Sequence, residues 1–242
     1  MDLWDKMVDM FGGNKGREEV PKGIADNVLI SFPKMIELIQ KNFPITKDRR
    51  ALDFGCGSGR FAKELHELGF LVTGIDISGE MIHAARQYLP KDVRLLTGSL
   101  DQICEERVFD LVTAGMVFQF IREIDVSLRA LDRLIKPAGI LALSVFNPPF
   151  VTDLLKAKVI FKDFDSVDFP THGLMELVKG ARIPVYLRGA EEYTGLLTCL
   201  GYEKIFEVVP PFTGEFLAKY PASFPTQNPE FLILGFQKSQ GR

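Results

Sequence analysis

Short apolar runs alternate along the chain with stretches whose apolar residues recur every three or four positions. The runs that predict strands are Ala51–Phe54, Leu71–Ile75, Val93–Leu96, Phe109–Thr113 and Ile140–Val145. The positions with helical spacing are Phe61, Leu65 and Leu68, then Met81, Ala84, Ala85 and Tyr88, then Leu128, Leu131, Leu134 and Ile135. Nearly all-apolar strands that alternate with helices predict a parallel sheet covered on both faces and joined by right-handed crossovers.

The two ends of the chain continue this pattern less regularly. Helical spacing after Pro33 predicts a helix over Met35–Phe43. Residues 12–23 are rich in glycine and predict a loop or hinge. Near the other end, two apolar runs, Lys204–Val209 and Phe231–Phe236, follow a predicted helix and are expected to pair antiparallel.

Residues 147–190 contain aromatic, proline and charged residues without a clean period. We expect them to form an insertion that covers the edge of the sheet. The predicted organisation is an N-terminal helical extension or lid over residues 1–46 and a main domain over residues 47–242 that carries a lid insertion at about 147–190.

Composition excludes several classes of protein. The chain has 242 residues, of which 25% are charged, and its net charge is −3. That charge does not favour nucleic-acid binding, which needs a basic face. Cys56, Cys104 and Cys199 lie far apart, which argues against a metal site and disulfides and favours a cytoplasmic protein. No apolar run approaches the roughly 18 residues needed to span a membrane.

The candidate chemistry begins with a glycine-rich turn after the first predicted strand. The segment is Leu52-Asp53-Phe54-Gly55-Cys56-Gly57-Ser58-Gly59. Glycines let a backbone turn sharply and approach a ligand at the carboxyl end of a parallel strand. The carboxylate of Asp53 would repel a pyrophosphate but suits a ligand with an ammonium group. Asp76 follows the second strand, where it can accept hydrogen bonds from ribose hydroxyls. NAD also has such hydroxyls, so this feature fits that cofactor as well.

With these features the sequence resembles the class I S-adenosylmethionine-dependent methyltransferases over roughly residues 48–147. The other segments that carry the resemblance are Gly74-Ile75-Asp76-Ile77-Ser78 with Met81, Phe109-Asp110-Leu111-Val112, and Leu134-Ile135-Lys136-Pro137-Ala138-Gly139. The resemblance implies a Rossmann-like three-layer α/β sandwich with a seven-stranded, mostly parallel sheet whose last strand is antiparallel. It also implies that S-adenosylmethionine contacts Asp53, Gly55, Cys56, Gly57, Gly59, Asp76, Ile77, Met81, Ser99, Leu100, Thr113 and Ala114. Many relatives have an aspartate where this chain has Ser99.

Methyl transfer is an in-line displacement that needs alignment, exclusion of water and, for some acceptors, a base. His172 lies in the insertion and is the best candidate base, although a structural role is the stronger alternative. Gln119 follows the fourth strand between two aromatic residues, where it could orient the acceptor or face solvent. The segment Asn147-Pro148-Pro149-Phe150 follows the fifth strand and is interpreted as a turn. It therefore does not indicate methylation of nucleic acid or of protein glutamine.

The sequence predicts an enzyme that transfers a methyl group from S-adenosylmethionine to a small organic acceptor, leaving S-adenosylhomocysteine. Aromatic residues in the insertion and near the end of the chain fit an organic, partly apolar acceptor. Two alternatives stay open: a nicotinamide-dependent oxidoreductase and a non-catalytic S-adenosylmethionine-binding protein. Neither nucleic acid nor a membrane is an expected partner, and the sequence indicates neither the acceptor nor the oligomeric state.

Overall fold

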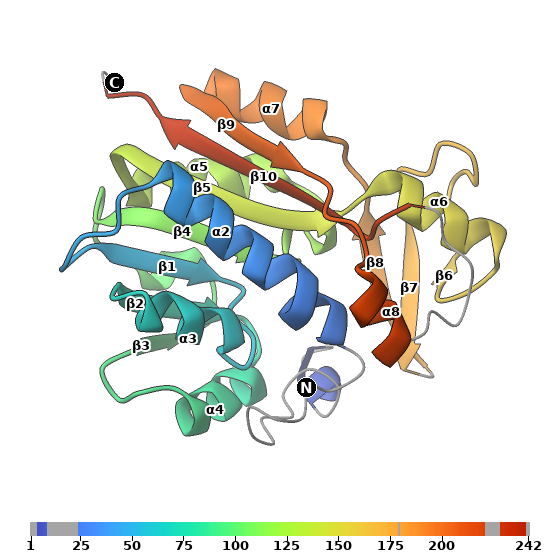
Figure 1. Cartoon of the computed structure of the whole chain (residues 1–242), viewed down its shortest axis with the longest axis horizontal. Coiled ribbons are helices and arrows are strands. Elements are labelled where there is room, and N and C mark those ends of the chain that lie inside the picture. Colours follow the sequence, from blue (N-terminus) through green and yellow to red (C-terminus); the bar gives the residue numbers. More distant parts are fainter. Residues whose placement is uncertain (1–3, 9–23, 179, 221–227, 241–242) are drawn as a thin grey trace.

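A seven-stranded sheet lies between two layers of helices in the computed structural model (Figure 1), which describes residues 4–8, 24–178, 180–220 and 228–240. Its strand order is β3-β2-β1-β4-β5-β10-β9. The strands are β1 (Arg50–Phe54), β2 (Leu71–Asp76), β3 (Arg94–Thr97), β4 (Phe109–Gly115), β5 (Ile135–Phe146), β9 (Tyr202–Val208) and β10 (Phe231–Lys238). The predicted Rossmann-like fold is confirmed.

The direction of the strands follows the prediction. Strands β1 to β5 pair in parallel, and β10 pairs antiparallel with both β5 and β9. The chain runs outward from β1 through β2 to β3 and then returns to β4 on the other side of β1. The strand order therefore reverses between β1 and β4, which is where open α/β sheets bind ligands.

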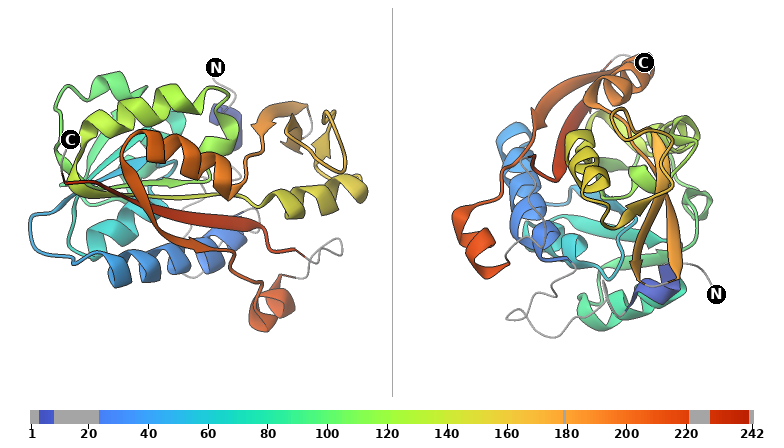
Figure 2. Two further views of the ribbon diagram at one scale, coloured as in Figure 1. Left: turned by 90° about the horizontal axis from the view of Figure 1, so that it is seen from above. Right: turned by 90° about the vertical axis from the view of Figure 1, so that its right-hand side faces the viewer.

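Each face of the sheet is covered by amphipathic helices. The helices are α2 (Phe32–Asn42), α3 (Arg60–Glu67), α4 (Gly79–Tyr88), α5 (Ile124–Leu134) and α7 (Ala190–Cys199). Apolar residues of α2, α3 and α4 pack in one core, and those of α5 and α7 pack in a second core on the opposite face (Figure 2). No helix in the described part of the chain is long and apolar enough to cross a membrane.

A buried lysine holds the end of α5 against the last strand. Lys238 is 8% exposed, and its Nζ donates to the carbonyl oxygens of Asp132 (2.7 Å) and Ile135 (3.2 Å). The same Nζ lies 2.7 Å from Asp132 Oδ1. A cation suits the negative end of a helix dipole.

The helix α5 ends at Leu134 and β5 begins at Ile135, so the predicted extension of helical spacing to Ile135 was wrong by one residue.

The insertion has more structure than its sequence indicates. It contains α6 (Pro148–Lys156) and a separate antiparallel sheet of β6 (Phe161–Lys162), β7 (His172–Val178) and β8 (Ala181–Tyr186). In β8, Ala181, Ile183 and Val185 are buried while the residues between them are more exposed. These apolar side chains form a third core with residues of α6 and the end of β5.

The described N-terminal elements are also helical. A 3-10 turn, Trp4–Met7, precedes a helix whose π-helical stretch, Asn27–Ser31, leads into α2. Met7 is fully buried in the third core. The predicted loop over 12–23 lies outside the described residues. A short helix, α8 (Gly214–Lys219), follows β9. The boundary between the extension and the main domain at residues 46 and 47 stays a prediction.

The packing of β10 on β9 gives a test of the fold. A Cβ added at Gly235 would lie 2.1 Å from the ring of Phe206, whereas one added at Gly195, in α7, would meet nothing within 4 Å. Gly235→Ala should therefore lower stability by about 1–3 kcal/mol. Gly195→Ala should raise stability by about 0.5–1 kcal/mol because alanine favours helices. Thermal unfolding followed by circular dichroism measures both, and equal melting temperatures for the two variants would contradict this packing.

Candidate functional site

The glycine turn joins the end of β1 to the start of α3 at the point where the strand order reverses. Gly57 has a φ of 52°, and a Cβ there would meet nothing within 4 Å, so its backbone conformation is the reason for glycine. Gly59 has a φ of 85° at the N-terminus of α3, and a Cβ there would lie 2.5 Å from Leu89 Cδ1. The backbone of the turn is therefore unobstructed at Gly57 and tightly packed against α4 and Leu89 at Gly59.

Asp53 is a buried carboxylate at the entrance to this turn. Its side chain is 2% exposed, and Oδ1 accepts a hydrogen bond of 2.9 Å from the Thr113 hydroxyl. Oδ2 is buried without a hydrogen-bond partner in the described part of the chain. Burial, opposed by the bond from Thr113 and assisted by the charge of Asp76, raises the pKa of Asp53 from 3.8 to about 7. A cationic group beside Oδ2 would restore its charge and satisfy it.

Asp76 lies at the end of β2 and holds the glycine turn in place. Its Oδ2 accepts from the amide of Gly57 and its Oδ1 from the amide of Ser78, both at 2.9 Å. Ser78 caps α4, since its Oγ accepts from the amide of Met81 at 3.1 Å. Both oxygens of Asp76 thus order the backbone at the edge of the cavity that Asp76 lines.

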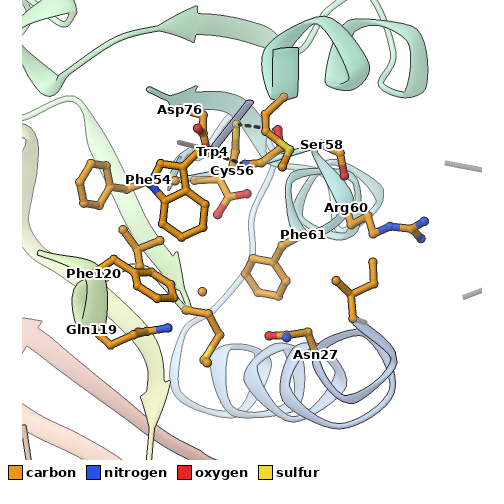
Figure 3. Close-up of a pocket in the computed structure, with 18 of the residues that line it drawn as sticks. Trp4, Asn27, Phe54, Cys56, Ser58, Arg60, Phe61, Asp76, Gln119 and Phe120 are labelled. Atoms are coloured by element: carbon orange, nitrogen blue, oxygen red, sulfur yellow. Dashed lines mark hydrogen bonds between the residues drawn. The ribbon is translucent and has the colours of Figure 1, made fainter. Parts of the chain in front are cut away.

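A cavity of about 440 Å³ opens in front of these carboxylates (Figure 3). Most of its wall is apolar, with Trp4, Phe32, Phe54, Phe61, Phe120, Phe146 and Phe150 among the residues that line it. Its charged lining residues are Asp26, Asp53, Asp76, Glu230 and Arg60. In Figure 3 the guanidinium of Arg60 points away from the centre of the cavity, and it lies 5.9 Å from the Tyr88 ring.

The N-terminal turn closes one side of this cavity. The Ser78 hydroxyl donates a hydrogen bond of 2.6 Å to Asp5 Oδ1, which joins the turn to the start of α4. The rings of Trp4 and Phe120 make an edge contact with centroids 4.8 Å apart. The N-terminal turn is thus attached to the two elements that follow β2 and β4.

Eight of the site residues predicted from sequence line the cavity. They are Asp53, Gly55, Cys56, Gly57, Asp76, Ile77, Met81 and Gln119. Gln119 is 1% exposed, and neither its Nε2 nor its Oε1 has a hydrogen-bond partner in the described structure. In Figure 3 its amide points across the cavity toward Asn27. The roles of these residues stay predictions, but the fold brings them together.

Five predicted cofactor contacts do not line the cavity. They are Gly59, Ser99, Leu100, Thr113 and Ala114. Ser99 is exposed, and its hydroxyl lies 3.2 Å from Asp101 Oδ2. Ala114 lies in β4 and is fully buried in the core. Thr113 contacts Asp53 instead. Gly98, next to Ser99, and Gly115, next to Ala114, line the cavity instead.

His172 lies outside the cavity, contrary to the expectation that the insertion would bring it there. It is 63% exposed, and its Nδ1 lies 3.4 Å from Asp165 Oδ2. Met175, in the same strand β7, does line the cavity. Successive side chains of a strand point to opposite faces, so residues 172 and 175 face different sides. This geometry does not support His172 as the base.

Two acidic residues of the cavity were missed by sequence reasoning. Asp26 precedes the π-helical stretch, where its Oδ1 accepts from the amide of Asn27 at 2.7 Å. Glu230 immediately precedes β10, and its carbonyl accepts from the amide of Asn147 at 2.7 Å. Neither belongs to a motif, and they are 204 positions apart (230 − 26), so only the fold brings them into one cavity.

The cysteine in the glycine turn is not a reactive thiol. Cys56 is 8% exposed, and burial, with the charges of Asp53 and Asp76, raises its pKa. The thiolate is the reactive form, so these effects suppress its chemistry. In the described part of the chain no group of three or more His, Cys, Asp or Glu side chains is arranged to hold a metal ion.

Comparison with known proteins identifies the central part of the chain. Residues 52–143 match a family described as "Methyltransferase domain". A ubiquinone biosynthesis O-methyltransferase of Xanthomonas oryzae pv. oryzae is 31% identical over 150 residues, covering 59% of this chain and 62% of that protein. The chain thus spans less than two thirds of the length of this curated relative.

Solved structures match more of the chain. A S-adenosylmethionine-dependent methyltransferase from Mesorhizobium loti has a TM-score of 0.66 at 20% identity and covers 85% of this chain and 96% of its own. A Burkholderia thailandensis 1,6-didemethyltoxoflavin-N1-methyltransferase, solved with 1,6-didemethyltoxoflavin and S-adenosylhomocysteine, has a TM-score of 0.62 at 17% identity. It covers 98% of this chain and 88% of its own, and this likeness concerns the fold.

The raised pKa of Asp53 predicts how Asp53→Asn changes stability. The carboxyl ionises near pH 4 in the unfolded chain and near pH 7 in the folded one, so the folded state binds more protons between these values. The stability of the parent protein therefore falls across this range as pH rises. Asp53→Asn should melt at a higher temperature than the parent, by more at pH 8 than at pH 5. The exposed Asp125→Asn is the matched control, and an advantage that is equal at both pH values would refute the assignment.

Proposed function

We propose that this chain, which belongs to the class I S-adenosylmethionine-dependent methyltransferase family, transfers a methyl group from S-adenosylmethionine to a small organic acceptor. The observation that carries the proposal is Asp53, a buried carboxylate with an unpartnered oxygen beside a glycine turn and an aromatic cavity. An unpaired buried carboxylate oxygen costs stability, which favours a ligand that supplies the missing partner.

The residues at the strand ends fit the cofactor. Asp53 Oδ2 would receive the ammonium of the methionine part, directly or through water. Asp76 would accept from the ribose hydroxyls in addition to the amides of Gly57 and Ser78 that it already holds. Ile77 is 52% exposed at the rim and Met81 lines the cavity, so both are available to an adenine ring.

When bound, S-adenosylmethionine supplies an electrophilic methyl group on a sulfonium. The chain's own contribution is to orient the acceptor and to exclude water. The aromatic walls, the edge contact between Trp4 and Phe120, and the N-terminal turn support both tasks. Gln119 offers one donor and one acceptor group to a polar edge of the acceptor.

The alternatives have less support. A nicotinamide cofactor would put a pyrophosphate beside the buried carboxylate of Asp53, which repels it. A protein that only binds S-adenosylmethionine would not need the apolar part of the cavity beyond the strand ends.

Free cysteines at positions 56, 104 and 199 favour the cytoplasm as the location. We also propose that the acceptor is neither a nucleic acid nor a membrane component.

Calorimetric titration with S-adenosylhomocysteine tests the cofactor half. Asp76→Ala should weaken binding by about 1–3 kcal/mol, because a ligand hydroxyl and the Gly57 amide lose their acceptor. The control is Asp125→Ala, an exposed residue of α5 that should bind like the parent protein. Equal affinity of Asp76→Ala and the parent would remove Asp76 from the site, and stabilisation by NAD instead of S-adenosylhomocysteine would refute the proposed function.

Trp4 gives a direct signal of ligand binding, since it is the single tryptophan of the chain and lines the cavity. Adding S-adenosylhomocysteine should shift the tryptophan emission excited at a wavelength that tyrosine does not absorb. The change should saturate with the dissociation constant found by calorimetry. Trp4→Phe is the control for other optical effects. If calorimetry detects binding while the emission stays constant, the N-terminal turn does not cover the ligand.

A further inference from the structure

Asp26 and Glu230 form a pair of carboxyl groups inside the cavity that the methyl donor does not require. Asp26 lies just before the π-helical stretch and Glu230 just before β10. Both residues line the same cavity. Burial, then the charge of Asp26 and a hydrogen bond with it, raise the pKa of Glu230 well above its ordinary range. A hydrogen bond between two carboxyl groups needs a proton that they share.

The pair is separated from the donor side of the site by the width of several strands. Asp53 lies near the end of β1, whereas the Glu230 carbonyl accepts from the amide of Asn147, just after the end of β5. In the strand order, β4 and β5 lie between β1 and β10. Three interstrand spacings of about 4.8 Å give about 14 Å across the sheet. The pair therefore belongs to the acceptor side of the cavity.

The charges of the cavity are unbalanced. Four of its described lining residues are acidic, and its single cation, Arg60, points away from the centre in Figure 3. Aromatic rings line the same space, and their faces attract cations. An anionic acceptor would meet the remaining negative charge of the carboxyl pair without a facing cation. A neutral acceptor would leave the carboxyl pair without a counter-charge in apolar surroundings.

A second polar group of the cavity, the amide of Gln119, lacks a hydrogen-bond partner in the described structure. Gln119 is 1% exposed, has no hydrogen bond from either amide atom, and points across the cavity toward Asn27, the neighbour of Asp26. Figure 3 shows its amide nitrogen on the side that faces Asn27, and both amide atoms are free of protein partners in the described structure. The amide can therefore pair with a polar group of the acceptor that also faces the carboxyl pair.

We infer that the methyl acceptor carries a basic nitrogen, held as a cation by Asp26 and Glu230, on an aromatic or apolar body that the phenylalanine walls enclose. This inference rests on the proposed function, since it assigns the acceptor of the same site. Charge-assisted hydrogen bonds fix the nitrogen, and ring contacts fix the body. Acceptors that carry a carboxylate or phosphate are excluded by the same charges.

Three probes of matched shape and different charge test this inference: phenethylamine, phenethyl alcohol and phenylacetate. Their binding to the full chain is measured by ligand-observed NMR in the presence of saturating S-adenosylhomocysteine. Phenethylamine should bind roughly ten- to a hundredfold more tightly than phenethyl alcohol, the range for hydrogen bonds to a charged group. Phenylacetate should bind more weakly than the alcohol.

Two isosteric variants attribute the preference to the pair. Glu230→Gln and Asp26→Asn should each reduce the preference for the amine over the alcohol about tenfold or more, and binding of the alcohol should stay within about threefold. Asp26→Asn keeps an oxygen that can accept from the Asn27 amide, so the helix start is preserved. Glu215→Gln, an exposed residue of α8, is the control and should keep the preference.

Each other outcome overturns the inference. Equal binding of the three probes, stronger binding of phenylacetate, or no binding of phenethylamine would exclude a cation site. A preference for the amine that persists in both variants would assign it to other groups. S-adenosylhomocysteine binding by calorimetry is measured on each protein first. Failure at that step would refute the proposed function, whereas normal cofactor binding without the charge preference would refute the acceptor assignment alone.

Discussion

Asp53 makes one hydrogen bond and lacks a second at the end of a central parallel strand, and the rest of the site depends on this arrangement. Its Oδ1 is held by Thr113 on the neighbouring strand, and its Oδ2 is buried without a partner. The surrounding sheet fixes β1 on both sides, through β2 and β4. The fold therefore keeps a carboxylate in a position that is unfavourable for stability and favourable for a cationic ligand.

Asp76 orders the backbone around this buried carboxylate. Its two oxygens hold the amides of Gly57 and Ser78, and Ser78 in turn joins α4 to Asp5 of the N-terminal turn. The glycine turn, the start of α4 and the N-terminal turn thus share one short chain of hydrogen bonds. A ligand that contacts Asp76 would act on all three, which connects cofactor binding with closure of the cavity by Trp4.

The sequence predicts the sheet and the donor side of the site because both rest on local patterns. Apolar runs alternate with helical spacing, which indicates a parallel sheet, and Asp53 and Asp76 stand near the carboxyl ends of two strands that are neighbours in that sheet. The insertion was predicted, but its strands were not, because Gly173 and Pro184 interrupt β7 and β8 and only β8 shows a period of two. His172 was misplaced for a related reason. Its position in β7 was not predicted, so the face of the small sheet toward which its side chain points could not be predicted either. Asp26 and Glu230 had no local signal, since they meet only after β10 has inserted beside β5.

The two halves of the cavity also differ in how they depend on the fold. The donor side is built from the ends of β1 and β2, whose backbone is fixed by the sheet. The acceptor side is built from the segment before α2, the residue before β10, the turn after β4 and the insertion. These segments connect or extend the elements of the sheet, so they can change without changing it. Gln119, Asp26 and Glu230 all lie on such segments. A charge on these segments can select an acceptor without altering the sheet that binds the methyl donor. In this chain the acidic pair, Asp26 and Glu230, is such a charge.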